Sequence, residues 1–320
     1  MQILSDWFLW AILAMVSLAS LFPHWAAAIH ANTLSDYGIF TIFFLYGVNL
    51  SVESLRTGLV NWRLHLLVQL STFVLFPLLF VPFRAVAGPW LPPDLLLGFF
   101  YLCALPSTIS SSVAMTAIAR GNVPAAIFNA TLSSLLGVVV TPALVSLVAQ
   151  TTGQAPPLGQ TVTKVATLLL LPFALGQLLR PFAGRFFGRY KKYTAISDKC
   201  IILLLVFAAF SDSVNAGLWT TYGPGVLALT VLATSALLAF VLALTTTLAR
   251  LLRFTVPDEI VAVLCGSKKT LASGAPMAKL IFAGSASLGP ILLPIIVYHQ
   301  IQLFVCSVLA RRYAGRVELS

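Results

Sequence analysis

Charged side chains are scarce in this chain of 320 residues, of which 9% are charged and 59% are hydrophobic. Soluble domains carry about 25% charged residues, and a soluble globule of this length could not bury so much apolar surface. The composition therefore predicts an integral membrane protein that faces lipid. The formal net charge of +10 would suggest nucleic acid as the partner of a soluble protein. Here the basic residues fall between apolar runs, as membrane orientation demands, so we expect a bilayer and no nucleic acid.

Cysteine and histidine are also rare, with four residues of each type. The cysteines lie inside or at the edges of apolar segments, and their spacing is typical of neither a disulfide framework nor a zinc site. We interpret them as small apolar packing residues. The histidines are scattered and pair into no metal or catalytic set, so we expect no metal site.

Long apolar runs are abundant instead, and ten of them can be marked. They run near 7–29, 37–54, 64–83, 94–119, 122–149, 161–182, 197–217, 223–248, 257–280 and 287–311. Most reach about 20 residues, which is enough to cross a bilayer core. The first is expected to be a retained helix and not a signal peptide, because residues 1–6 contain Asp6 and no Lys or Arg. The predicted fold class is an all-α integral membrane protein with ten transmembrane helices.

The 19 Lys and Arg residues are distributed unevenly between the two sides of such a bundle. Arg84, Lys164 and Lys279 would lie on one side, and Lys268 and Lys269 fall inside the ninth segment. The others lie at the C-terminus and in the intervals after segments 2, 4, 6 and 8, among them a basic loop at 183–196. The positive-inside rule then predicts a cell (inner) membrane protein with both termini in the cytoplasm.

Segments 4 and 9 are interrupted near their centres by polar residues together with Pro or Gly. Four identities relate positions 103–115 to 265–277 at a constant offset, and Thr108 is thereby matched to Thr270. Each segment is the fourth in a block of five, so residues 1–150 and 151–320 are predicted to be two inverted five-helix repeats. Paired broken helices in such repeats indicate the binding site of a transporter, because irregular backbone survives at membrane depth only where protein or a wet cavity satisfies it.

A run of hydroxyl side chains follows the proline in segment 4. It comprises Ser107, Thr108, Ser110, Ser111 and Ser112. Small hydroxyl residues can serve helix packing alone. However, hydroxyls and freed carbonyls can also coordinate Na⁺, and half-helix N-termini attract anions. We favour a binding role.

Lys268 and Lys269 stand near the middle of segment 9. Each mid-membrane lysine costs about 2.5–3.5 kcal/mol on insertion scales, and such residues are functional by default. The alternative is a structural ion pair, for which Asp212 and Glu53 are the nearest acids by topology. Adjacent helical residues point about 100° apart, so we expect one lysine to face the substrate. The other would pair with an acid or reach the carbonyls of a broken helix.

Two amides in neighbouring segments are further candidates, namely Asn129 in segment 5 and Gln69 in segment 3. Both could complete a site or only join helices by hydrogen bonds. An intramembrane hydrolase is the competing class, since Ser-Lys dyads can be catalytic. The chain lacks Gly-x-Ser-x-Gly, His-Glu-x-x-His and paired mid-membrane carboxylates, so we expect a transporter and not an enzyme.

Two stretches of sequence resemble the bile acid:sodium symporter family. The first is Ala119-Arg120-Gly121-Asn122-Val123, running on to Thr141-Pro142, which is similar to the junction of helices 4 and 5 in that family. The second is Cys265-Gly-Ser-Lys-Lys-Thr with Pro276-Met277 and Tyr298-His299, which resembles a divergent, largely bacterial branch. The resemblance implies a core domain from helices 3–5 and 8–10, beside a panel domain from helices 1, 2, 6 and 7. It also implies that helices 4 and 9 cross at their breaks.

The resemblance carries over only part of the family's sodium sites. The Ser-Asn pair on helix 4 falls on Ser111 and Ser112, a helix-3 glutamine corresponds to Gln69, and the helix-9 glutamate falls near Ser267. Two helix-5 hydroxyl ligands fall on Ala126 and Ala130, which cannot coordinate an ion. A lysine 4 Å from Na⁺ costs about 4 kcal/mol at an effective dielectric of about 20. We therefore expect that a lysine replaces one sodium or that coupling runs through protons.

These observations predict a symporter-like secondary transporter that moves a small organic anion across the plasma membrane by alternating access. We expect no cofactor, with Na⁺ or H⁺ as the coupling ion. A metalloid efflux permease of the same superfamily, with a thiol such as Cys103 on helix 4, is the alternative within transport. Substrate identity, transport direction and oligomeric state do not follow from the sequence.

Overall fold

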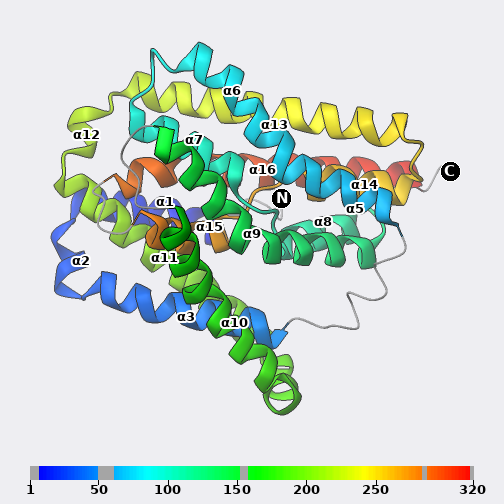
Figure 1. The fold of residues 1–320 in the computed structure, drawn as a ribbon, viewed down its shortest axis with the longest axis horizontal. Helices are drawn as coiled ribbons and strands as arrows, with labels where there is room; N and C mark the ends of the chain where they lie inside the picture. The colour runs from blue at the N-terminus through cyan, green and yellow to red at the C-terminus, as the bar shows by residue number, and fades with distance from the viewer. Residues whose placement is uncertain (1–6, 50–60, 152–157, 283–286, 318–320) are drawn as a thin grey trace. The chain divides into compact units, whose positions relative to one another are not determined.

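The computed structural model describes residues 7–49, 61–151, 158–282 and 287–317 (Figure 1), and all regular secondary structure in these ranges is helical. The first block of helices is α1 (Trp7–Leu21), α2 (His24–Ala28), α3 (Ala31–Asn49), α5 (Trp62–Leu70), the π-helical turn η1 (Ser71–Leu75), α6 (Phe76–Ala87), α7 (Pro93–Ala104), α8 (Ser110–Ile118) and α9 (Val123–Thr151). The second block is α10 (Leu158–Arg189), α11 (Lys191–Asn215), α12 (Leu218–Thr221), α13 (Pro224–Leu251), α14 (Val256–Gly266), α15 (Leu271–Ile281) and α16 (Leu288–Val317).

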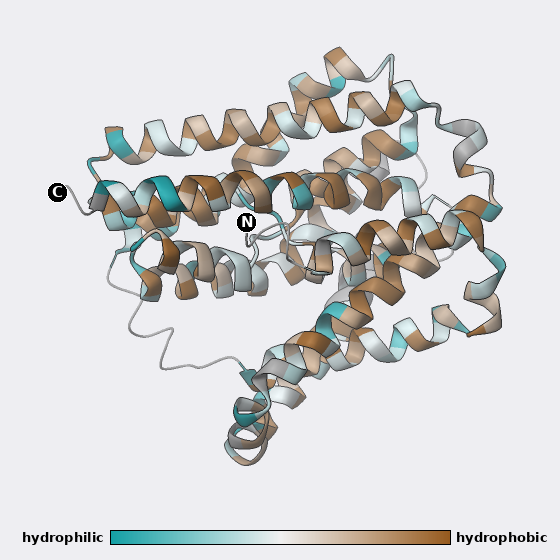
Figure 2. Cartoon of the chain, turned by 180° about the vertical axis from the view of Figure 1, so that it is seen from behind, coloured by the Kyte–Doolittle hydropathy of each residue, from teal (hydrophilic) through white to brown (hydrophobic). Residues whose placement is uncertain are grey.

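Helices occupy each of the ten apolar ranges marked in the sequence, but six of them are long and apolar enough to cross a membrane. These are Trp62–Ala87, Val123–Val148, Thr167–Gly184, Tyr193–Asn215, Pro224–Leu251 and Leu288–Arg316. The breaks in segments 4 and 9 divide each into two short helices, and α1 has only 15 residues. Figure 2 shows hydrophobic residues along most of the long helices, with hydrophilic residues toward helix ends and turns. The protein is thus a helical multi-pass membrane protein, and the count of ten crossings stays a prediction.

Two details of the predicted helices are wrong. The first apolar run is divided after Leu21, because Pro23 has no N–H for the preceding turn and its ring clashes with a continuing helix. The expected loop at 183–196 is helical on both sides of a turn at Tyr190, where α10 gives way to α11. Its aromatic and basic residues are compatible with a helix, and no proline follows Pro181 in this stretch.

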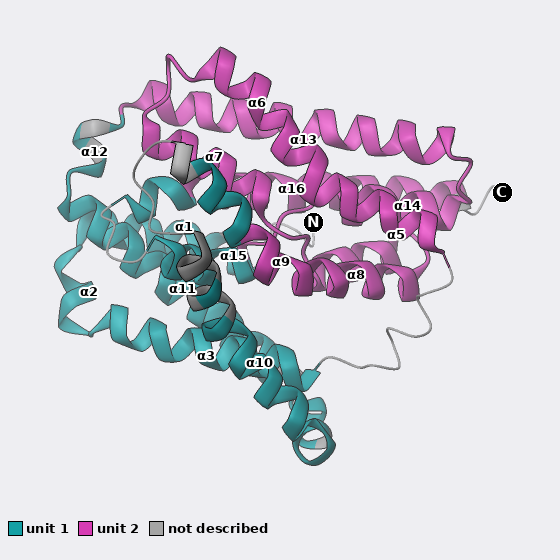
Figure 3. Ribbon diagram, in the orientation of Figure 1, with its two compact units in different colours: residues 1–50, 142–222, 272–292 teal, residues 51–141, 223–271, 293–320 magenta. Residues whose placement is uncertain are grey.

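The chain divides into two compact units (Figure 3). Unit 1 comprises Met1–Leu50, Pro142–Tyr222 and Ala272–Leu292, and in it α3 packs along α10 while α1 packs along α11. Close approach of α3 and α10 depends on Gly47 and Gly176, where a Cβ atom would collide with the backbone of Phe173 and Phe44 respectively. Small residues at such crossings are the usual means of packing helices in lipid.

Unit 2 comprises Ser51–Thr141, Gly223–Leu271 and Leu293–Ser320. In this unit α14 packs against α13, α5 and α8, and α6 packs against α7. The starts of its helices follow local sequence signals: Pro93 and Pro224 stand in the first turns of α7 and α13, where a missing N–H costs nothing. Asn61 caps α5 by accepting a hydrogen bond from the N–H of Leu64 at 3.4 Å. The candidate site residues named from the sequence all lie in unit 2.

Candidate functional site

Both predicted interruptions are present in the structure. Helix α7 ends at Ala104, the chain is extended at Leu105, and α8 begins at Ser110. Pro106 lacks an N–H and disfavours a helical residue before it, while the hydroxyl residues that follow compete for backbone hydrogen bonds. The second helix is broken after Gly266, and α15 begins at Leu271. Each break leaves the last carbonyls of a helix without intrahelical partners.

The carbonyls at the end of α7 are satisfied by side chains and backbone from other elements. Cys103 and Leu105 accept from Lys269 Nζ at 2.8 and 2.7 Å. Ala104 accepts from Thr141 Oγ1 at 2.8 Å, and Pro106 accepts from the N–H of Thr270 at 3.0 Å. Lys269 and Thr270, from the break after α14, thus supply the hydrogen-bond donors for three of these four carbonyls at the break after α7.

The carbonyls at the end of α14 in turn accept hydrogen bonds from residues at the break after α7 and in α8. Ser107 Oγ donates to the carbonyl of Cys265 at 2.6 Å, and Ser112 Oγ donates to that of Leu264 at 3.3 Å. Farther along the break, Tyr298 OH donates to the carbonyl of Ser267 at 2.6 Å. The two broken helices therefore stabilise each other, as irregular backbone in a membrane protein requires.

Lys269 lies in a cage of acceptors and is fully buried. Besides Cys103 and Leu105, its Nζ donates to the carbonyl of Thr72 at 2.8 Å. Thr72 belongs to the π-helical turn η1, and such turns often mark functional sites. The ring of Phe76 lies 4.0 Å from Nζ, which places the ammonium on an aromatic face. Three N–H donors thus meet three carbonyls, and the hydrogen-bonding capacity of the ammonium is used in full.

Gln302 on α16 holds the backbone of Lys269 on both sides. Its Oε1 accepts from the N–H of Lys269 at 2.8 Å, and its Nε2 donates to the carbonyl of the same residue at 2.7 Å. This amide replaces the helical hydrogen bonds that the break removes, so it fixes the direction in which the lysine side chain leaves the backbone.

Lys268 is also fully buried, but its surroundings differ. Its Nζ donates to the carbonyl of Ser111 at 2.9 Å and contacts Met115 Sδ at 2.8 Å. A thioether is a weak acceptor, so the ammonium has capacity for a further, stronger partner. The two lysine side chains have different partners, and of the two only Lys269 is enclosed by carbonyls. The expectation that both residues lie in a helix is wrong, because they fall in the break between α14 and α15.

The hydroxyl run of segment 4 forms a cluster at the start of α8. Thr108 Oγ1 shares hydrogen bonds of 2.8 Å with both Ser111 Oγ and Ser112 Oγ. Ser107 donates its N–H to Ser133 Oγ at 2.9 Å, whereas Ser110 is exposed and belongs to none of these contacts. Since Lys268 binds the Ser111 carbonyl, the cluster lies beside the less satisfied ammonium.

Gln69 and Asn129 form a separate polar contact between α5 and α9. Gln69 Nε2 donates to the carbonyl of Asn129 at 3.1 Å, and Asn129 Nδ2 donates to His65 Nδ1 at 2.9 Å. Gln69 Oε1 is buried and has no hydrogen-bond partner among the described residues. The sequence analysis gave the scattered histidines no role in a site, and the spacing of four residues between His65 and Gln69 is the signal that could have placed His65 in this contact.

The alternative of a structural ion pair finds no support in the part of the chain that the structure describes. Neither lysine forms an ion pair there, and Asp212 accepts a hydrogen bond from Asn32 Nδ2 at 3.1 Å instead. Glu53 lies outside the described residues. Among the described residues no group of His, Cys, Asp and Glu could hold a metal ion.

Comparison with known proteins places the whole chain in one family. Residues 6–315 match the model of the SBF-like CPA transporter family. An uncharacterized protein of Pseudomonas aeruginosa is 46% identical over 98% of this chain and 95% of its own length. "Putative symporter YfeH" of Escherichia coli is 45% identical over 98% and 94% of the two chains. Rat sodium/bile acid cotransporter 7 is 28% identical over 96% and 92%.

These matches confirm the resemblance on which the sequence analysis relied, and they confirm transport rather than catalysis as the class of function. The chain belongs to the SBF-like CPA transporter family, within the bile acid:sodium symporter superfamily.

Proposed function

We propose that this protein is a symporter-like secondary active transporter that carries a small organic anion across the plasma membrane by alternating access. The observation that carries the proposal is Lys268, a buried ammonium beside the hydroxyl cluster of a broken helix, with one weak thioether among its two acceptors. A buried charge of this kind demands a counter-charge, and an anionic substrate supplies one. The N-terminus of α8, which begins at Ser110, adds the positive end of a helix dipole.

Lys269 has a different role in this proposal. Its ammonium fills a cage of three carbonyls that would otherwise suit a monovalent cation, and it therefore takes the place of one sodium ion. The family resemblance agrees with this role of Lys269, because it places two sodium ligands at Ala126 and Ala130, whose side chains cannot coordinate an ion. A covalently attached ammonium satisfies these broken-helix carbonyls without a bound ion.

In this proposal, Lys268 and the remaining polar groups couple anion transport to the driving ion. A protonated Lys268 attracts the anion, and a bound anion in turn favours the protonated lysine. Affinity for the anion should therefore fall as pH rises and the ammonium loses its proton, with little dependence on external Na⁺. If Na⁺ is the coupling ion after all, Gln69 with its unpartnered Oε1 is the group that we expect to coordinate it.

The architecture that we propose has ten crossings in two inverted repeats, 1–150 and 151–320, with helices 4 and 9 crossing at their breaks. Support comes from helices in all ten apolar ranges and from the breaks at equivalent places in the two blocks. Alternating access also needs two bodies that move as wholes. The two compact units support that requirement, since unit 2 holds most of the expected core helices and unit 1 most of the expected panel helices.

The charge distribution supports a location in the cell (inner) membrane with both termini in the cytoplasm. A C-terminal reporter that fluoresces only after export should stay dark in intact cells. Fluorescence from that fusion would reverse the proposed orientation.

Uptake of a panel of labelled solutes into proteoliposomes tests the function itself. We expect accumulation of one class of organic anion, and no cleavage of any solute. Transport of arsenite in place of organic anions would favour the metalloid permease, and hydrolysis of a panel member would favour an intramembrane enzyme. The two relatives named as a symporter and a sodium/bile acid cotransporter guide the choice of solutes.

A further inference from the structure

A groove of about 510 Å³ runs along unit 2 between α13 and α16. Its walls are mostly apolar and include Leu242 on α13 with Phe304 and Val308 on α16. Phe304 and Val308 are 54% and 39% exposed, so the groove is open along its length. Both helices belong to spans apolar enough to cross a membrane, and the exposed wall therefore lies where lipid chains are.

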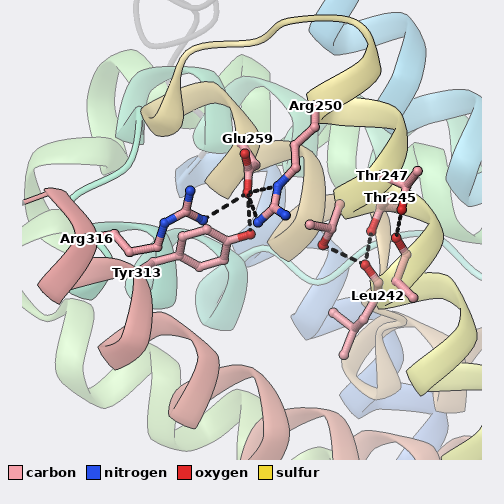
Figure 4. Close-up of polar contacts among 9 residues, drawn as sticks. Leu242, Thr245, Thr247, Arg250, Glu259, Tyr313 and Arg316 are labelled. Atoms are coloured by element: carbon pink, nitrogen blue, oxygen red, sulfur yellow. Dashed lines mark hydrogen bonds and ion pairs between the residues drawn. The ribbon is translucent and has the colours of Figure 1, made fainter. Parts of the chain in front are cut away.

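The threonine hydroxyls of the groove wall are engaged within their own helix. Thr246 Oγ1 donates to the carbonyl of Leu242 at 2.7 Å, and Thr247 Oγ1 donates to that of Ala243 at 2.9 Å. Figure 4 shows threonine hydroxyls of α13 turned back onto their own helix in this way. With these donors engaged, the wall suits a hydrocarbon chain better than a peptide, whose backbone would need hydrogen-bond partners.

Arg312 lines the groove at the end of α16, and the nearby helix ends carry more positive charge. Arg250 and Arg316 both donate to Glu259 Oε1, at 3.2 and 3.4 Å, and Tyr313 OH donates to the same atom at 2.9 Å. Figure 4 shows these side chains converging on Glu259 from α13 and α16. The carboxylate of Glu259 is thus shared by two arginines, which leaves a net positive charge. Among the described residues, no ion pair neutralises Arg312.

We infer that this groove binds an anionic phospholipid, with an acyl chain along Leu242, Phe304 and Val308 and the phosphate held by Arg312. Arg312 lies two helical turns from Phe304, or about 12 Å along the axis, so one lipid can fill the apolar wall and reach the arginine. The excess of positive charge at the helix ends favours a headgroup with net negative charge over a zwitterionic one. Basic pockets between transmembrane helices are known to recognise such headgroups.

Native mass spectrometry of the purified protein tests this inference with phosphatidylglycerol and phosphatidylcholine of identical chains. We expect phosphatidylglycerol to be retained preferentially by the unmodified protein. Arg312→Gln should lower that retention about fivefold, the factor that one arginine contributes near a charged membrane surface. Arg311→Gln is the matched control, because Arg311 is exposed, adjacent and equally charged but does not line the groove.

Val308→Trp provides a second variant that fills the apolar wall and leaves every charge in place. It should reduce retention of both lipids, and added inorganic phosphate should displace neither. Equal retention of the two lipids, or equal losses in the Arg311 and Arg312 variants, would overturn the inference. Displacement by phosphate alone would indicate an anion site without a chain, and a dimer lost in Val308→Trp would indicate a second copy in the groove.

Discussion

Replacement of Lys269 by methionine should destabilise the protein, because it removes the donor of three buried carbonyls. Thr72, Cys103 and Leu105 would each lose a hydrogen bond of 2.7–2.8 Å. An orphaned buried acceptor costs about 1–3 kcal/mol, so three cost about 6 kcal/mol. Loss of the contact with the Phe76 ring adds about 2 kcal/mol. Relief of the ammonium's burial penalty returns several kcal/mol, which leaves a net loss of about 3–5 kcal/mol.

Thermal unfolding in detergent measures this loss, with Lys268→Met as the matched control. Lys268 binds a carbonyl in the first turn of α8 and a thioether. Its removal leaves few buried acceptors without a hydrogen bond, so it should lower the free energy of unfolding by under about 1 kcal/mol. If the ammonium replaces a sodium ion, added Na⁺ should raise the unfolding temperature of Lys269→Ala more than that of the unmodified protein. Equal unfolding temperatures for Lys269→Met and the unmodified protein would refute the reasoning.

The hydroxyl cluster, the helix-end charges and the helix-4 thiol each give a further prediction. The double substitution Ser111→Ala with Ser112→Ala should abolish uptake in proteoliposomes and leave folded protein in the membrane; normal uptake would reduce these serines to packing. Glu259→Gln should lower stability by about 1–2 kcal/mol, a modest loss because its arginine partners are half exposed and solvent screens them. An unchanged unfolding temperature would contradict that expectation. Cys103→Ser should keep transport activity, since the contact with Lys269 comes from its carbonyl and not its thiol; loss of arsenite resistance in cells with this variant would instead favour metalloid efflux.

The helical spans and the two breaks could be predicted because their signals are local. Pro106 and the hydroxyl residues that follow it interrupt one apolar run, and Gly266 with the lysine pair interrupts another. Composition alone identified these runs as membrane helices. Helix geometry predicted that the side chains of Lys268 and Lys269 point in different directions. Their partners do differ, but both residues lie in the non-helical break after Gly266, so helix geometry is not the cause.

The partners of the lysines could not be predicted, because they are distant in sequence and on different helices. Thr72 and Lys269 are 197 positions apart, and Gln302 is 33 positions beyond the lysine that it holds. Helices that are apolar all round show little periodicity, so the sequence does not indicate which face of α16 meets the break. The π-helical turn that exposes the Thr72 carbonyl likewise has no local signal that distinguishes it from ordinary helix.

Uptake of the transported anion by the unmodified protein and by Lys268→Met, each with and without external Na⁺, tests the central claim most directly. The account predicts that the unmodified protein accumulates the anion with little dependence on Na⁺. It also predicts that folded Lys268→Met accumulates none. Full uptake by Lys268→Met together with a strict requirement for Na⁺ would contradict the account, because the anion would then need no buried ammonium and sodium would still drive transport.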